Sequence, residues 1–130
     1  MHAYDIVVVG GGIVGLTQAL ALKGSGLSVA VVEGHVSESM PSGDPQLRVS
    51  ALTLATENIL RNLGVWQHLD VSRICSYVDM QVWDQDSFAK IEFSAQQVEK
   101  QQLGHIVENQ AIRHSLWIQA QNSSFIELLA

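Results

Sequence analysis

Apolar residues recur along the chain with two periods, and the changes between them predict its elements. Residues 4–9 form a short run rich in valine that leads into three glycines, which is typical of a buried parallel strand. From Val14 to about Lys23 apolar side chains recur at helical spacing, and a Gly-Ser-Gly run ends that helix. A second buried strand is expected at 29–32. Together these segments predict a βαβ unit over residues 4–33.

The pattern changes after this βαβ unit. Residues 34–48 hold both prolines and several serines, which predicts a loop. Apolar residues then recur at steps of three and four from Leu52 to Leu63, which predicts a helix that ends at Gly64. Within residues 77–93 the period becomes two on both sides of a polar turn, which predicts an antiparallel hairpin.

The remaining elements decide the fold class. A helix is expected to begin near Asn109, and residues 125–129 indicate a third core strand in which the chain stops. The hairpin at 77–93 does not suit a parallel sheet, so we assign it to a second layer or domain. The sequence therefore predicts an α/β fold with a Rossmann-like βαβ unit and a parallel sheet. Residues 1–130 would be the N-terminal part of a larger, incomplete nucleotide-binding domain.

Composition narrows the class of protein. The hydrophobic fraction of 47% and the charged fraction of 15% are those of a globular chain. A formal net charge of −6 and the absence of basic runs argue against nucleic acid and against a polybasic membrane patch. No stretch approaches the roughly 18 apolar residues of a membrane span, and no secretory signal is evident, so we expect a cytoplasmic protein. The single cysteine, Cys75, has no metal-ligand spacing and is expected to be a buried thiol.

The glycine run after the first strand carries the chemistry. Gly10, Gly12 and Gly15 match G-x-G-x-x-G. The first glycine permits a tight turn, the second lets backbone approach a pyrophosphate, and the third lets helix and strand pack closely. Phosphate oxygens would meet the N–H groups at the start of the helix, where Ile13 and Val14 lie. The strand before the run and the helix after it favour a nucleotide site over a ligand-free turn.

Glu33 is the expected partner of a ribose. It ends the second strand 18 residues after Gly15, close to the roughly 20 expected of an acid that binds ribose hydroxyls. An acid there also repels the 2′-phosphate of NADP. The competing interpretation is a merely solvated strand end. The βαβ unit alone does not choose between FAD and NAD, since both present an ADP half.

Further motifs support FAD. Residues 47–52, 63–66 and 103–109 resemble the FAD-dependent aromatic hydroxylases of ubiquinone biosynthesis, which are class A flavin monooxygenases. The stretch 80–88 is most similar to the VisC type, the 2-polyprenylphenol hydroxylases. By this resemblance, residues 1–130 are an N-terminal fragment that holds the βαβ unit, half of the FAD site and a hairpin from the sheet of the substrate domain. The family's downstream Gly-Asp motif is absent, and the chain alone is expected to be inactive.

The resemblance implies an activity. Such enzymes hold FAD tightly, reduce it with NAD(P)H and use O2 to hydroxylate a polyprenylphenol. Arg48 would lie near the flavin's phosphate and ribityl region, and Asn109 near the ribityl chain. From the residues alone, Arg48 is a solvated charge and Asn109 a good helix N-cap. His105 is expected to be structural, and the three tryptophans to be core or interface residues; no catalytic acid or base is assigned.

Alternatives remain at this point. The parent protein could be another FAD- or NAD-dependent oxidoreductase that shares only the nucleotide unit. The chain as given could be a catalytically inactive module that self-associates through uncovered apolar edges. The apolar substrate of the resembled family implies that the protein acts at the periphery of the inner membrane. The resemblance also leaves open a homo-oligomer or a complex with other ubiquinone-biosynthesis enzymes. The ring position, the prenyl length and the choice of NADH or NADPH are not fixed by these residues.

Overall fold

The computed structural model describes residues 3–37 and 39–130. The helices within them are α1 (Ile13–Ala21), α2 (Leu54–Asn62) and α3 (Asn109–Gln121), with short 3-10 turns at Trp66–His68, Val71–Arg73 and Ala95–Val98. The strands are β1 (Ile6–Val9), β2 (Val29–Val32), β3 (Val49–Thr53), β4 (Cys75–Tyr77), β5 (Asp79–Trp83), β6 (Lys90–Ser94), β7 (Gly104–Glu108) and β8 (Ile126–Leu129).

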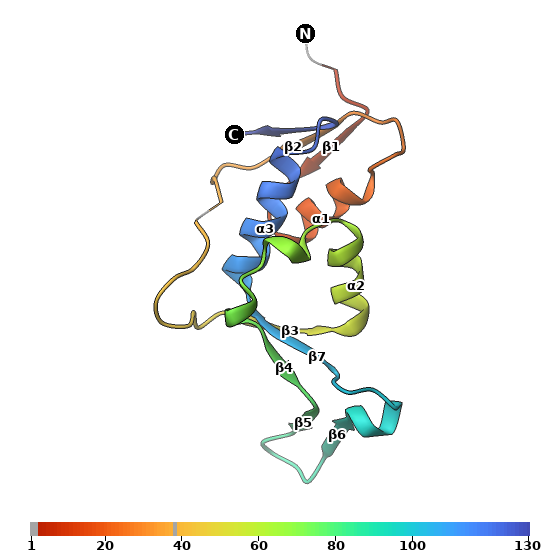
Figure 1. Ribbon diagram of the computed structural model, residues 1–130, viewed down its shortest axis with the longest axis vertical. Helices are drawn as coiled ribbons and strands as arrows, with labels where there is room; N and C mark the ends of the chain where they lie inside the picture. The colour runs from red at the N-terminus through yellow and green to blue at the C-terminus, as the bar shows by residue number, and fades with distance from the viewer. Residues whose placement is uncertain (1–2, 38) are drawn as a thin grey trace.

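The predicted βαβ unit and its parallel sheet are confirmed. β1 and β8 both pair with β2 in parallel, giving the order β1-β2-β8, with Val7 opposite Ala30 and Ala30 opposite Glu127. Figure 1 shows α1 and α3 side by side next to this sheet. The expectation of a fully buried first strand is wrong. Val9 is 84% exposed, because the helices cover one face of β1 and leave the alternate side chains uncovered.

A second, antiparallel sheet was only partly predicted. β7 lies between β3 and β4. Residues 49–53 are extended, so the predicted helix begins later than Leu52: Thr53 is its N-cap, and the Thr53 hydroxyl oxygen accepts a hydrogen bond from the amide of Thr56 at 3.2 Å. The predicted stop at Gly64 is confirmed, with φ of 75°. Cys75 lies on β4 and is exposed, so the expected buried thiol is a wrong prediction: the edge strand turns that side chain outward.

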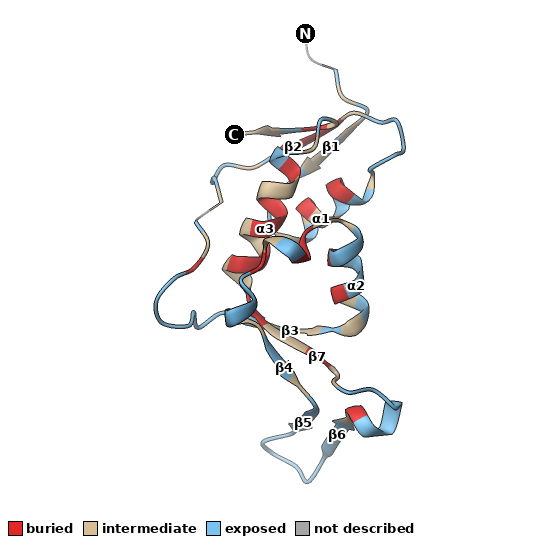
Figure 2. Ribbon diagram, viewed as in Figure 1, coloured by how far each residue is buried: buried red, intermediate tan, exposed pale blue. Residues whose placement is uncertain are grey.

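The predicted hairpin is confirmed as an antiparallel pair, β5 and β6. Met80 faces Phe93 and Val82 faces Ile91 across it. It pairs with neither of the other two sheets, and Figure 1 shows it at the opposite end of the molecule from the parallel sheet. In Figure 2 both of its strands are almost wholly exposed.

The core lies between the parallel sheet, α1, α3, and the end of α2 with the turn that follows it. Its fully buried side chains include Leu16, Val31, Val107, Ile112 and Leu116. Trp66 and Trp117 are buried in the same cluster, as expected, whereas Trp83 on the hairpin is exposed. This core fixes the start of α1 and the start of α3 relative to one another, and these two helix ends carry the candidate site.

Candidate nucleotide site

The glycine turn joins β1 to α1. Gly10 has φ of 107°, a conformation that favours glycine, and its amide donates to the carbonyl oxygen of Val32 at 2.8 Å. A Cβ on Gly15 would lie 2.0 Å from the carbonyl oxygen of Gly10, so only glycine lets the helix approach the turn this closely. A Cβ on Gly12 would meet nothing within 4 Å. The turn therefore has space outside it at Gly12, where a ligand could approach.

The first turn of α1 offers backbone donors to that space. Gly12 is the N-cap, in extended conformation, and no side chain caps it. Ile13 and Val14 are the first two helical residues, and N–H groups at such positions have no partner within the helix. The helix dipole adds partial positive charge at the same place. The turn and helix start can thus hold an anion such as a pyrophosphate.

The Glu33 carboxylate folds back over the glycine turn. One oxygen accepts a hydrogen bond from the amide of Gly11 at 2.8 Å, and the other from the amide of His35 at 2.9 Å. The His35 amide first, and then that of Gly11, hold the pKa of the Glu33 carboxyl below its ordinary value, with the Arg113 charge adding to both. Glu33 is therefore ionised at neutral pH and sits at the tip of β2, beside the turn.

Arg113 joins these pieces and was missed by sequence reasoning. Its Nε donates to the carbonyl oxygen of Gly11 at 3.0 Å, and its Nη2 to that of His35 at 2.8 Å. Nη2 also lies 3.7 Å from a Glu33 carboxylate oxygen. The one available signal was its position: it stands four residues after Asn109 in the same helix, and such residues share a face.

A backbone hydrogen bond joins Asn109 to Arg48. The amide of Asn109 donates to the carbonyl oxygen of Arg48 at 3.0 Å, and the Ser50 hydroxyl donates to the Asn109 side-chain oxygen at 2.5 Å. The predicted N-cap role of Asn109 is wrong. Glu108 occupies the cap position and Asn109 is the first helical residue, because β7 runs directly into α3 and leaves the asparagine side chain to Ser50.

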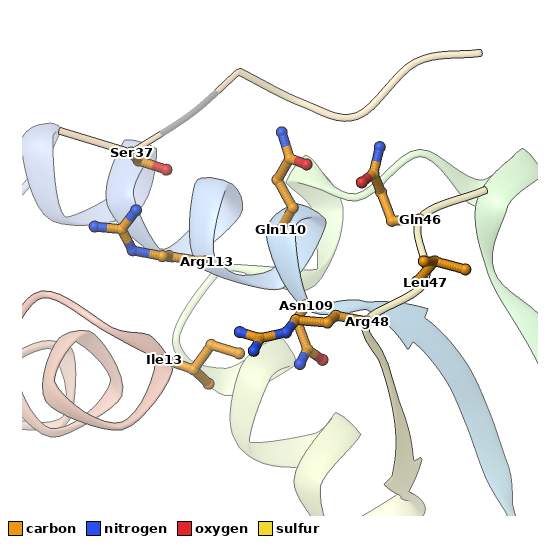
Figure 3. A pocket seen from close by; sticks show the side chains of 8 residues that line it. All are labelled: Ile13, Ser37, Gln46, Leu47, Arg48, Asn109, Gln110 and Arg113. Carbon is orange, nitrogen blue, oxygen red and sulfur yellow. The ribbon is translucent and has the colours of Figure 1, made fainter. Parts of the chain in front are cut away.

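These segments enclose an open cleft of ≈ 390 Å³. The cleft is lined by Ile13, Ser37, Gln46, Leu47, Arg48, Asn109, Gln110 and Arg113. Figure 3 shows the Arg48 side chain extended over the cleft beside Asn109, with Ile13 across from it and Arg113 farther along α3. A second hollow of ≈ 330 Å³ adjoins Glu33 and is lined also by Val36, Trp117 and Leu129. Of the predicted residues, Ile13, Arg48 and Asn109 thus line the cleft, and Glu33 lines the second hollow.

A buried ion pair anchors the loop that carries Arg48. Arg73 donates to both oxygens of Glu108, at 2.7 and 2.9 Å, and to the carbonyl oxygen of Gly43 at 2.9 Å. The amide of Gln46 donates to Glu108 at 2.7 Å. The Arg73 guanidinium chiefly holds the pKa of the Glu108 carboxyl below its ordinary value. Sequence reasoning missed this pair, whose members lie 35 residues apart.

His105 is structural, as predicted. Its Nδ1 lies 2.7 Å from an oxygen of Glu57, and its ring meets that of Trp66 edge-on, with centroids 5.6 Å apart. Glu57 also binds Arg61, at 2.8 Å. This cluster lies against a different hollow from the cleft, so it takes no part in the candidate site.

Residues 3–37 and 39–130 offer neither a metal site nor a membrane-spanning helix. No group of three histidine, cysteine, aspartate or glutamate side chains could hold a metal ion. Among the same residues, no helix has the length and apolar character needed to cross a membrane.

The chain is similar to known proteins. Residues 5–44 match the family model of the FAD dependent oxidoreductases. The chain is 32% identical over 114 residues to 3-demethoxyubiquinol 3-hydroxylase of Escherichia coli, covering 87% of this chain and 29% of that protein. It is 33% identical over 119 residues to the human mitochondrial ubiquinone biosynthesis monooxygenase COQ6, covering 87% and 25%. The chain thus spans less than a third of either relative.

Solved structures share the fold. The p-nitrophenol 4-monooxygenase PnpA of Pseudomonas putida superposes with a TM-score of 0.62 and 25% identity, over 95% of this chain and 30% of that one. The flavin-dependent halogenase CmlS superposes with a TM-score of 0.64 at 22% identity, over 98% and 23%, which shows the fold alone.

The fold and the glycine turn define a class of protein: the chain has the nucleotide-binding architecture of the FAD-dependent oxidoreductases. Within that class, it resembles the FAD-dependent hydroxylases of ubiquinone biosynthesis, and the family resemblance predicted from residues 47–52 and 103–109 is confirmed. The narrower VisC-type assignment stays a prediction.

Proposed function

We propose that this chain supplies the ADP-binding half and part of the ribityl-binding half of an FAD site, in a monooxygenase that hydroxylates a polyprenylphenol. The observation that carries the proposal is that separate segments of the chain come together at one cleft. Three segments far apart in sequence line one cleft: the start of α1 at Ile13, the loop at 46–48 and the start of α3. Arg113, which also lines the cleft, joins it to the glycine turn by donating to the Gly11 carbonyl oxygen. Each of the three segments contributes the kind of group that a dinucleotide needs at that point.

The residues present fit the ADP half of FAD. The pyrophosphate would lie against the open side of Gly12 and the amides of Ile13 and Val14, at a helix N-terminus. Glu33 would accept hydrogen bonds from the adenosine ribose hydroxyls. The hollow that Glu33, Val36 and Trp117 line would receive the adenine ring.

The flavin end would lie toward Arg48 and Asn109. Arg48 offers a fork of donors to phosphate or ribityl oxygens, and Asn109 offers an amide next to it. When bound, FAD would supply the oxidation chemistry, reduced by NAD(P)H and reacting with O2. The described residues bind and orient it. The polyprenylphenol substrate and the reductant rest on the similarity to the ubiquinone-biosynthesis hydroxylases, as does work near a membrane surface.

The hairpin would belong to the substrate side of the parent protein. Its two strands carry apolar residues that this chain leaves exposed, among them Val82, Ile91 and Phe93. We assign it to the sheet of a substrate domain, in which those side chains would be covered.

The same exposed side chains favour a second candidate for the chain by itself, an inactive module that self-associates through the hairpin. Light scattering across a range of protein concentrations distinguishes the two. A mass that rises with concentration, and falls back in an Ile91→Lys variant, supports self-association; a constant monomer mass contradicts it.

The direct test of the proposed function is a titration of the chain with FAD, followed by flavin fluorescence, with NAD and FMN as competitors. We expect saturable binding of FAD that FMN, which lacks the ADP half, does not displace. Replacing Glu33 with alanine should weaken binding about tenfold, because hydrogen bonds to a charged group are lost. Glu92→Ala on the exposed hairpin is the control and should bind like the original chain. Tighter binding of NAD than of FAD would contradict the proposal.

A further inference from the structure

Arg113 holds a place in the site that neither the glycine motif nor the family motifs explain. It lies on α3 with its side chain largely buried, at 24% exposure. Its guanidinium donates to two backbone carbonyl oxygens that belong to different segments, Gly11 in the glycine turn and His35 after β2. One arginine thus connects the segments that follow the two neighbouring strands β1 and β2.

The carbonyl of Gly11 is the informative partner. The amide of the same residue donates to Glu33, so both polar groups of Gly11 are fixed, one by an anion and one by a cation. The orientation of this residue determines where the neighbouring amides of the turn point. A change in it would rotate the donors that face the open side of Gly12.

Arg113 also couples the turn to the other end of the cleft. Its guanidinium lies over the ring of Trp117, 5.7 Å from the centroid, which holds the side chain against its own helix. Asn109 lies one turn earlier on the same helix and borders the same cleft. The arginine therefore connects the glycine turn with the helix that bears a predicted ribityl contact.

We propose that Arg113 is a positioning residue of the ADP-binding half: by bridging the Gly11 and His35 carbonyl oxygens, it holds the glycine turn and the Glu33 loop in the arrangement that receives a nucleotide. This inference rests on the proposed FAD site. The geometry calls for arginine in particular, because a planar fork can serve two divergent acceptors, while a lysine ammonium is a point charge on a flexible stem.

The test compares ADP with FAD in Arg113→Gln and Arg113→Lys variants. Both substitutions should weaken ADP and FAD by the same factor, about tenfold, since the loss lies in the half that the two ligands share. The lysine variant should regain little of the affinity that the glutamine variant loses. If Arg113 acted through its charge alone, the lysine variant would regain most of that affinity. In contrast, Asn109→Ala should weaken FAD and leave ADP unchanged.

Arg61→Gln is the matched control. Arg61 also lies over a tryptophan ring and pairs with a glutamate, but it borders another hollow. It should lower the thermal midpoint without changing either dissociation constant. If Arg113→Gln binds ADP and FAD as tightly as the unsubstituted chain does, the inference is overturned and the FAD proposal still stands.

Failure of the unsubstituted chain to bind either ligand would instead contradict the proposed function. Amide NMR then decides the role of Arg113 without any ligand. Arg113→Gln should shift the Gly11, Glu33 and His35 amide resonances and speed hydrogen exchange at Gly11, because the turn loses its anchor. Unchanged resonances and exchange at all three would overturn the inference.

Discussion

The two ends of the molecule differ in how their apolar residues are used. In the nucleotide-binding end, β1, β2, β8, α1 and α3 share a core in which Leu116 is 0% exposed. At the other end, β5 and β6 pair only with each other, and Ile91 and Phe93 remain 58% and 49% exposed. The nucleotide site therefore rests on a core that several elements share, although one face of β1 stays exposed, whereas the apolar residues of the hairpin have no such core to pack into.

The largest effect is expected in the core. Leu116→Ala removes a fully buried side chain of the core cluster and should lower the free energy of unfolding by about 4 kcal/mol. Urea unfolding followed by circular dichroism measures it. A loss below about 1 kcal/mol, typical of an exposed site, would contradict the comparison.

Two substitutions in the glycine turn should distinguish its role in helix packing from its role in ligand binding. Gly15→Ala places a methyl group against the Gly10 carbonyl oxygen and should cost about 3 kcal/mol of stability, together with FAD binding. Gly12→Ala has free space and should keep the original stability, yet weaken FAD about tenfold or more because the methyl group occupies the pyrophosphate approach. Thermal melts with FAD titrations check both. Equal stability losses in the two variants would contradict the assigned difference.

The Arg73–Glu108 pair should make stability depend on pH. The pKa of Glu108 is below its ordinary value of 4.5, so its contribution is fully present above that value and is lost as pH falls through the lower folded pKa. Glu108→Gln should cost about 2 kcal/mol at neutral pH, since the partly buried hydrogen bonds from Arg73 and Gln46 lose their anionic acceptor. Urea midpoints between neutral and acid pH measure both. An acid decline equally steep in the variant would show that other groups cause it.

The smallest effect is expected on the hairpin. Ile91→Thr keeps a β-branched residue opposite Val82 and should change the free energy of unfolding by no more than about 0.5 kcal/mol. The same urea measurement, compared with Leu116→Ala, decides it. A cost near that of the core variant would mean that the hairpin is covered in solution.

The sequence predicted what local patterns encode. The βαβ unit, the glycine turn, Glu33 and the hairpin all follow from spacing and turn chemistry within short windows. The helix after the long loop was placed too early, because Leu52 suits a strand as well as a helical face and pairing with β7 decided between them. Asn109 was taken as an N-cap because residue type alone does not reveal that β7 runs directly into α3.

The missed residues act through tertiary contacts. Arg113 lies 102 residues from its partner Gly11, and Arg73 lies 35 residues from Glu108. No motif encodes such pairs in one sequence, since an arginine on a helix is by default a surface charge. The sequence did show that Arg113 lies in the helix that begins near Asn109, which is a predicted contact of the ribityl chain.

Amide NMR mapping of FAD on the 130-residue chain tests the central claim most directly. The account predicts that FAD shifts resonances of the glycine turn, Glu33, Arg48 and the start of α3, and leaves residues 79–94 unchanged. Shifts concentrated on the hairpin, or none at FAD concentrations that saturate related sites, would contradict the claim that the nucleotide-binding end forms a usable half-site.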